Sequence, residues 1–278
     1  MSWVKEFYVD NAGLYGSAIL SNLWDDGKKT AGALKTILDE RKIPAPQSNV
    51  LDVPCGNGRI AIPLAKFGMR VTGVDLSPAY IRIAKESAAK QRVQNRTNFL
   101  VGRAEKLQDV LQKKGIFDAA INIHTNLGYG STRDDEAFLR ATRDLVKDGG
   151  VFLITSRRNE KNVLTNLQEA TFLETESMLV LQNNRYVQSQ SRLYTTWRFF
   201  RKSRNAKTKL SRMASTHLIQ VGKDIRTGVR LYSNRQLIEL LDRTGWRLLE
   251  WGETIICRTK PVSEDSATVY FLCEKSRK

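Results

Sequence analysis

Short apolar runs and longer amphipathic segments alternate through the first half of the chain. Five runs rich in β-branched and apolar residues predict buried strands: 49–55, 70–75, 97–102, 117–124 and 151–156. The segments between them have helical periodicity. Because a crossover helix is the usual connection between parallel strands, this alternation predicts an α/β fold with a parallel sheet that helices cover on both faces.

The segments between the strands also carry residues that begin and end helices. Ser77 is placed to cap a helix, and Pro78 follows at its first helical position. Gly68 is placed to end the preceding helix. The four helices expected between the strands are 59–68, 76–92, 104–114 and 134–148.

The alternation stops after the fifth strand. Residues 171–221 contain several β-like runs without a helical segment between them, which predicts an antiparallel meander inserted into or appended to the sheet domain. Residues 234–245 then predict another helix, and 246–253 and 268–275 predict two final strands. Residues 1–45 carry amphipathic helical patterns that end at a pair of prolines.

The composition narrows the class of protein. Apolar residues make up 41% of the 278 positions and charged residues 27%, which excludes wholesale disorder. No apolar run approaches the length of a membrane span, and the first residues lack the apolar core of a signal peptide. The three cysteines are far apart and odd in number, which indicates neither a disulfide framework nor a metal site. We therefore expect a soluble, cytoplasmic protein.

Positive charge is concentrated in the expected β-rich segment. The formal net charge is +16, and the stretch from Ser177 to Lys223 holds ten basic residues and no acidic one. These cations fit a solvated sheet edge, where they deter edge-to-edge pairing, or a surface for a phosphorylated small molecule or RNA. Aromatic residues interleave with the cations at 194–202, but no RRM or KH signature accompanies them. We favour the solvated edge or a small anion.

The most informative stretch follows the first expected strand and reads Asp52-Val53-Pro54-Cys55-Gly56-Asn57-Gly58. A strand that ends in a carboxylate and runs into glycines brings backbone N–H groups close to a ligand at a helix N-terminus. Asp75 ends the second strand, where an acid can accept hydrogen bonds from both hydroxyls of a ribose. S-adenosylmethionine and a dinucleotide both fit, because residues 56–61 also satisfy the degenerate dinucleotide pattern.

The joint order of several motifs resembles that of the class I S-adenosylmethionine-dependent methyltransferases. The acid-led glycine loop, Asp75, the FD segment at 117–120 and the KDGG turn at 147–150 follow that family's order. The resemblance covers residues 45–157 and 230–278. It implies S-adenosylmethionine as cofactor, with S-adenosylhomocysteine as product. It also implies a Rossmann-like sheet of seven strands, mostly parallel, with a C-terminal antiparallel hairpin.

Within the class, the chain is most similar to the sugar-amine N-methyltransferases of antibiotic pathways. The shared features are the CGxG loop at 55–58, the LGY element at 127–129 and the β-rich insertion at 171–221. This looser resemblance implies four parts. They are an N-terminal helical lid, 1–45; a cofactor-binding core, 46–157; a basic, β-rich substrate cap, 158–229; and the C-terminal part of the core sheet, 230–278.

The class resemblance also implies the residues that bind the cofactor, with Asp52 near its methionine end. Two positions depart from the family pattern. Pro54 replaces the first glycine of the loop, and Arg103 stands where many relatives place an acid for the adenine amine. The adenine contact then falls to the Ala104 backbone, to Glu105 or to another group. The full set expected to bind the cofactor is Tyr15, Asp52, Pro54, Cys55, Gly56, Asn57, Gly58, Asp75, Leu76, Ala104, Glu105 and Asn122.

Candidate catalytic residues follow the fourth strand, whose carboxyl end faces the ligand in an open α/β sheet. His124 is either a general base, since imidazole titrates near neutrality, or a neutral residue of the pocket wall. Tyr129 is a second catalytic candidate, and Asn126 a residue of the acceptor site. Tyr8 and Tyr15, seven residues apart, would share one face of a lid helix or pack in a core.

These features predict a methyltransferase that acts on a nitrogen or oxygen atom of a small molecule, which can be anionic. The main alternative is a tRNA or rRNA methyltransferase that binds RNA through residues 177–223. The third is a cofactor-binding protein without transferase activity, or an NAD-dependent enzyme. His217 is expected to be structural unless the insertion brings it over the site. The sequence indicates neither the oligomeric state nor the acceptor.

Overall fold

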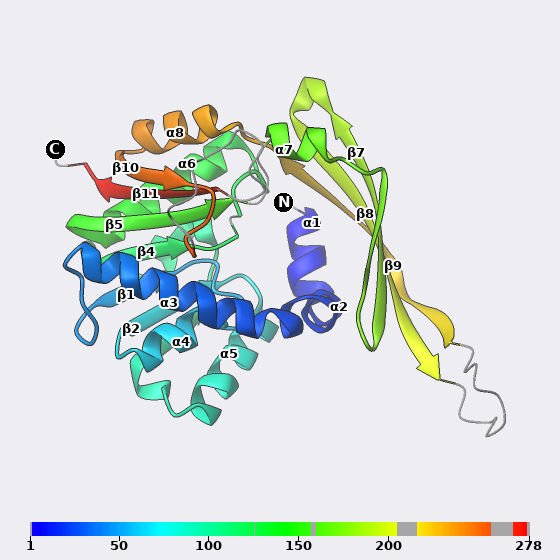
Figure 1. Ribbon diagram of the computed structural model, residues 1–278, viewed down its shortest axis with the longest axis horizontal. Coiled ribbons are helices and arrows are strands. Elements are labelled where there is room, and N and C mark those ends of the chain that lie inside the picture. The colour runs from blue at the N-terminus through cyan, green and yellow to red at the C-terminus, as the bar shows by residue number, and fades with distance from the viewer. Residues whose placement is uncertain (1, 125, 157–159, 205–215, 257–268, 277–278) are drawn as a thin grey trace.

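A computed structural model describes residues 2–124, 126–156, 160–204, 216–256 and 269–276 of the chain. Figure 1 shows two sheets, a seven-stranded one with its helices and a four-stranded one, with the N-terminal helices between them. In the described part of the chain, no helix is long and apolar enough to cross a membrane.

The larger sheet has the strand order β10-β11-β5-β4-β1-β2-β3. Strands β1 to β5 are parallel, and β11 runs antiparallel to both β5 and β10. This confirms the expected seven-stranded, mostly parallel sheet with an antiparallel hairpin. Its strands are β1 Asn49–Asp52, β2 Arg70–Asp75, β3 Thr97–Val101, β4 Phe117–Asn122, β5 Val146–Ser156, β10 Trp246–Gly252 and β11 Val269–Lys275.

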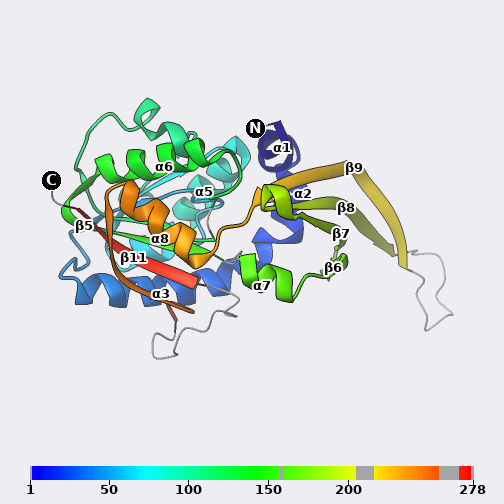
Figure 2. The same ribbon diagram turned by 90° about the horizontal axis from the view of Figure 1, so that it is seen from above.

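Helices cover both faces of this sheet, and Figure 2 shows α3 and α6 on opposite sides. Side chains of successive strand residues point to opposite faces, so Val50 packs with α3, α4 and α5, whereas Leu51 packs with α6 and α8. The helices of the core are α3 Trp24–Glu40, α4 Ala61–Lys66, α5 Pro78–Lys90, α6 Thr132–Leu145 and α8 Asn234–Arg243. The remaining α-helices are α1 Ser2–Lys5, α2 Ala12–Ala18 and α7 Glu160–Thr165.

Helix boundaries were predicted with mixed success. Ser77 caps α5 as expected, because its hydroxyl accepts the Tyr80 N–H at 3.4 Å, and Pro78 begins the helix. The helix expected at 104–114 is wrong. The segment instead forms a 3-10 helix, Ala104–Asp109, with a break in the middle. Leu107 is its single buried side chain, and one buried side chain does not stabilise a longer helix.

The turn expected before the fifth strand lies inside β5. Helix α6 ends at Leu145, and β5 begins at the next residue. Pairing with β4 then jumps from Val146 opposite Phe117 to Val151 opposite Ala119. The intervening residues are looped out of the pairing around a glycine with positive φ.

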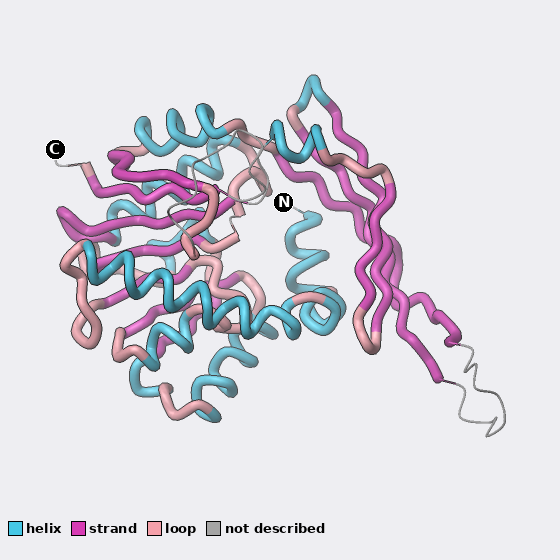
Figure 3. Tube along the Cα trace, in the orientation of Figure 1, coloured by secondary structure: helices cyan, strands magenta, loops and turns pink. Residues whose placement is uncertain are grey.

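The smaller sheet is an antiparallel meander in the order β6-β7-β8-β9, as the residue pattern predicts. Its magenta strands run beside the N-terminal helices in Figure 3. Val180, Trp197 and Phe199 on one face pack against Phe7 of the N-terminal segment, which joins this sheet to the N-terminus. The strands are β6 Ala170–Glu174, β7 Met178–Val187, β8 Arg192–Arg204 and β9 Thr216–Arg230.

The loop after β4 is fastened to the segment that returns from the smaller sheet. Gly128 accepts the Arg230 N–H at 2.8 Å, and its own N–H donates to the buried carboxylate of Asp135. Asp135 also accepts a hydrogen bond from the Tyr232 hydroxyl at 2.6 Å. Burial raises the pKa of Asp135 to about 6, and these two donors oppose that rise. The loop that carries Tyr129 is therefore held by contacts with two other segments.

Replacing Gly128 with alanine should destabilise the fold strongly. Its φ is +83°, and an added Cβ would lie 2.2 Å from the Arg230 carbonyl oxygen, a backbone atom that cannot easily move. Gly149→Ala is the matched control, because its φ is +78° but no atom lies within 4 Å of the added Cβ. Chemical denaturation should show a loss of about 1–2 kcal/mol for Gly149→Ala and about 3 kcal/mol or more for Gly128→Ala. Equal losses would contradict the close approach to Arg230.

Candidate active site

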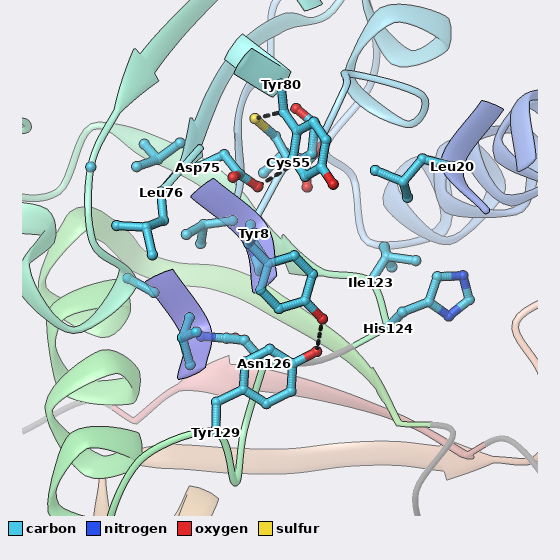
Figure 4. Close-up of a pocket in the computed structure, with 18 of the residues that line it drawn as sticks. Tyr8, Leu20, Cys55, Asp75, Leu76, Tyr80, Ile123, His124, Asn126 and Tyr129 are labelled. Carbon is cyan, nitrogen blue, oxygen red and sulfur yellow. Dashed lines mark hydrogen bonds between the residues drawn. The ribbon is translucent and has the colours of Figure 1, made fainter. Parts of the chain in front are cut away.

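A cavity of about 420 Å³ lies at the carboxyl ends of β1 to β4, beneath the N-terminal helices. Figure 4 shows residues of these elements around it. Of the residues singled out from the sequence, those that line the cavity are Tyr8, Tyr15, Asp52, Pro54, Cys55, Gly56, Asp75, Leu76, Ala104, Glu105, His124, Asn126 and Tyr129. The cavity thus brings together residues of the N-terminal segment and residues as far along the chain as Tyr129.

Three of the residues expected at the cofactor do not line the cavity, namely Asn57, Gly58 and Asn122. A Cβ on Gly58 would lie within 3.2 Å of the Ala84 and Phe99 side chains, so this glycine lets the loop pack on α5 and β3. Asn122 is fully buried and donates to the Val53 carbonyl at 2.6 Å. Gly58 and Asn122 therefore support the loop from below.

Asp75 fastens the glycine loop to the start of α5. Its Oδ2 accepts the Gly56 N–H at 2.8 Å, and its Oδ1 accepts the Ser77 N–H at 2.9 Å. Burial raises the pKa of Asp75 to about 6, and the two backbone donors oppose that rise. Each carboxylate oxygen keeps a second lone pair, so Asp75 can also accept hydrogen bonds from a ligand.

Gly56 gives the loop its shape. Its φ is +53°, a left-handed conformation that glycine adopts without steric cost. No atom lies within 4 Å of the position that a Cβ would take, so Gly56 is required by its backbone angle and faces open space. The loop leaves room there for a ligand to approach the backbone.

Asp52 is an unusual acid because it is almost completely buried, with 1% exposure. Among the residues that the structure describes, no donor reaches its Oδ2 atom. Burial raises the pKa of Asp52 to about 8, although nearby Arg59 favours the charged form. A buried acceptor without a donor is costly, and a cationic or hydrogen-bonding ligand would relieve that cost.

Arg103 and Glu105, at the end of β3, pair with each other. The Arg103 Nε–H donates to Glu105 Oε1 at 2.8 Å, and a guanidinium N–H donates to the same oxygen. Arg103 thus occupies part of the acceptor capacity of Glu105. Ala104 and Glu105 both line the cavity, and Arg103 bonds to only one of the two Glu105 carboxylate oxygens.

The roof of the cavity is aromatic. Tyr8 and Tyr15 do not share one helix, because the chain breaks at Asn11 between a π-helix, Glu6–Asp10, and α2. Their rings nevertheless meet edge to face, with centroids 5.5 Å apart. The Tyr8 and Tyr129 hydroxyls lie 2.8 Å apart, and their rings are stacked at 5.8 Å (Figure 4). This pair joins the N-terminus to the loop after β4.

His124 lies two residues beyond β4 with φ +61°, which is uncommon for a residue other than glycine. Its N–H donates to the Thr155 hydroxyl at 2.8 Å. The ring Nε2 lies 3.8 Å from Asp26 Oδ2, and Arg59 Nη1 lies 3.8 Å from the same oxygen. A strained backbone that places a titratable ring in a cavity is typical of functional sites.

Asp26 and Arg59 are site residues that the sequence did not single out. Asp25 and Asp26 both stand in the first turn of α3, and their sequence context does not tell them apart. His217 lies in β9 opposite Ser203, and its side chain is outside the described residues.

Acids that flank the basic stretch neutralise part of it. Arg198 pairs with Asp224 at 2.8 Å, and Lys202 pairs with Glu174 at 2.5 Å. Lys207, Lys209 and Arg212 lie outside the described residues. Both acids lie just beyond the ends of the acid-free stretch 177–223. Basic residues of this stretch therefore have acidic partners that the stretch itself lacks.

Comparison with known proteins identifies a methyltransferase domain in this chain. Residues 50–150 match the methyltransferase domain family. The ubiquinone biosynthesis O-methyltransferase of Xanthomonas campestris pv. campestris (strain B100) is 32% identical over 148 residues, which are 51% of this chain and 59% of that protein. The chain thus spans about three-fifths of the length of this curated relative.

Solved structures share the fold over nearly the whole chain. An S-adenosylmethionine-dependent methyltransferase from Clostridium acetobutylicum aligns with a TM-score of 0.74 and 16% identity, covering 96% of this chain and 98% of that one. CalS10, an amino pentose methyltransferase from Micromonospora echinaspora solved with bound S-adenosylmethionine, aligns with a TM-score of 0.61 and 14% identity, covering 89% and 92%. Residues 50–150 therefore carry a methyltransferase domain, and the chain has the fold of the S-adenosylmethionine-dependent methyltransferases.

Proposed function

We propose that this chain transfers a methyl group from S-adenosylmethionine to a nitrogen or oxygen atom of a small molecule. One observation carries the proposal. The glycine loop with Asp75 and the His124–Tyr129 group line the same cavity, so cofactor and acceptor can meet there. The curated relative is an O-methyltransferase, and the structural neighbour KedS8 from Streptoalloteichus is a sugar N-methyltransferase, which supports both acceptor atoms.

The residues present fit S-adenosylmethionine, which supplies an electrophilic methyl carbon when bound. Asp75 would accept the ribose hydroxyls with the lone pairs that Gly56 and Ser77 leave. Asp52 would face the cationic methionine end, because its Oδ2 lacks a donor within the described structure. The other expected contacts would come from Tyr15, Pro54, Cys55, Gly56, Leu76, Ala104 and Glu105. Asn57, Gly58 and Asn122 would support the loop.

The acceptor would lie beneath Tyr8 and Tyr129, near His124. An oxygen or ammonium acceptor arrives protonated, and His124 would take up that proton at its ring. The tyrosine pair would fix the acceptor and exclude water, and positioning of this kind supplies much of the rate. Tyr129 would act mainly through its hydroxyl, which already holds Tyr8.

Three cations around the cavity are compatible with an acceptor that carries negative charge. Lys5, Arg59 and Arg103 line the cavity, and each lies at ion-pair distance from a carboxylate. Exposed ion pairs of this kind are weak, so Lys5 and Arg103 can also meet an anionic acceptor.

The proposal is tested by incubating the chain with methyl-labelled S-adenosylmethionine and cell extract separated into RNA, protein and small metabolites. We expect label in the small-metabolite fraction. His124→Gln should reduce that label about 100-fold if the ring acts as a general base. Label confined to RNA would contradict the small-molecule proposal and favour binding through residues 177–223.

Cofactor affinity should depend on pH through Asp52. Burial raises its pKa to about 8, so the carboxyl is mostly protonated near neutrality and ionises as the pH rises. S-adenosylhomocysteine keeps the α-ammonium group of the methionine end, and this cation binds the ionised carboxylate better, so affinity should increase with pH. Calorimetry should show S-adenosylhomocysteine binding about five-fold to ten-fold tighter near pH 8.5 than near pH 7.

Asp52→Asn is the control for this pH dependence, because the amide does not ionise. Its affinity should be weaker and nearly the same at both pH values. If the variant keeps the pH dependence of the unmodified chain, Asp52 does not face the cationic end of the ligand.

A further inference from the structure

Asp26 occupies a special place at the start of α3. An added Cβ on neighbouring Gly27 would lie 2.4 Å from the Arg59 carbonyl oxygen, so the helix packs directly on the glycine loop. This close approach fixes Asp26 beside the cavity, with its side chain 35% exposed. Asp25, by contrast, points to solvent at 86% side-chain exposure and pairs with Lys28. Two adjacent acids therefore have different surroundings.

The Asp26 carboxylate lies between two groups that carry or can carry positive charge. Its Oδ2 is 3.8 Å from His124 Nε2 and 3.8 Å from Arg59 Nη1. The Arg59 side chain is 8% exposed and the His124 side chain 24%, so solvent screens these interactions only in part. Other titratable groups around the cavity are Lys5, Tyr8, Tyr15, Asp52, Cys55, Asp75, Tyr80, Arg103, Glu105 and Tyr129.

We propose that Asp26 is the positioning residue of His124. It holds the Nε2 edge of the ring toward α3, and the imidazolium that forms when His124 takes a proton from the methyl acceptor then lies beside its carboxylate. When His124 becomes cationic, Asp26 stabilises the imidazolium, as a carboxylate does beside a catalytic histidine. The role of His124 as base rests on the proposed function, whereas the pairing with Asp26 does not.

Arg59 balances this pair and links it to the cofactor loop. With Asp26 present, the guanidinium has a nearby counter-charge. Without Asp26, Arg59 would keep Asp52 as a nearby counter-charge, but the carboxylate that lies between Arg59 and His124 would be lost, which disfavours the imidazolium. Removing the Asp26 carboxylate therefore takes away an attraction to the imidazolium and strengthens its repulsion by Arg59. Both effects lower the pH at which the His124 ring titrates.

Nuclear magnetic resonance can read this directly, because the chain contains only two histidines, His124 and His217. The Cε1–H signals of the full chain are titrated without any ligand, and His124→Gln identifies the His124 signal. Asp26→Asn should lower the His124 titration midpoint by about half a unit to one unit. Asp25→Asn, the matched control, should shift it by less than about 0.2 unit.

Two further variants keep the inference falsifiable. Arg59→Gln should raise the midpoint, so the direction can be tested even if Asp26→Asn disturbs α3. In the methyl-transfer assay, Asp26→Asn should slow the reaction when it is the only substitution. It should have no added effect in a chain that already carries His124→Gln. An unshifted midpoint in Asp26→Asn, or equal shifts in Asp25→Asn, would overturn the inference. Absence of methyl transfer by the unmodified chain would instead contradict the proposed function and leave the titration valid.

Discussion

The site depends on one carboxylate that holds two pieces of backbone together. Asp75 accepts N–H groups from Gly56 and Ser77, so the loop after β1 and the start of α5 are fixed at the point where the strand order of the sheet reverses. Gly58 lets the same loop pack closely on α5 and β3. Because the loop is fixed from beneath, its upper surface can present a buried acid, Asp52, to a ligand.

The smaller sheet supports the roof of the cavity. Phe7 packs on Trp197, and one residue later Tyr8 bonds to Tyr129 in the loop after β4. That loop is in turn held by Asp135 and the segment returning from β9. The smaller sheet therefore supports both the N-terminal segment and the loop after β4.

The sequence predicts what depends on local pattern. The buried runs 49–55 and 70–75 locate the first two strands, although β1 itself ends at Asp52, and the glycines that follow Asp52 locate the loop. Contacts between distant segments, such as Tyr8 with Tyr129, leave no local signal. Asp26 could not be told from its neighbour, because its environment is created by the packing of α3 on the loop. The helix expected at 104–114 failed because its pattern lacked enough buried partners.

The most direct test of this account is the affinity of Asp75→Ala for S-adenosylhomocysteine, measured by calorimetry beside Asp109→Ala, which removes an exposed acid. Thermal melting first establishes that both variants are folded. The account predicts at least about ten-fold weaker binding for Asp75→Ala, since hydrogen bonds to a buried carboxylate are lost, and no change for Asp109→Ala. Unchanged affinity in a folded Asp75→Ala protein would contradict it.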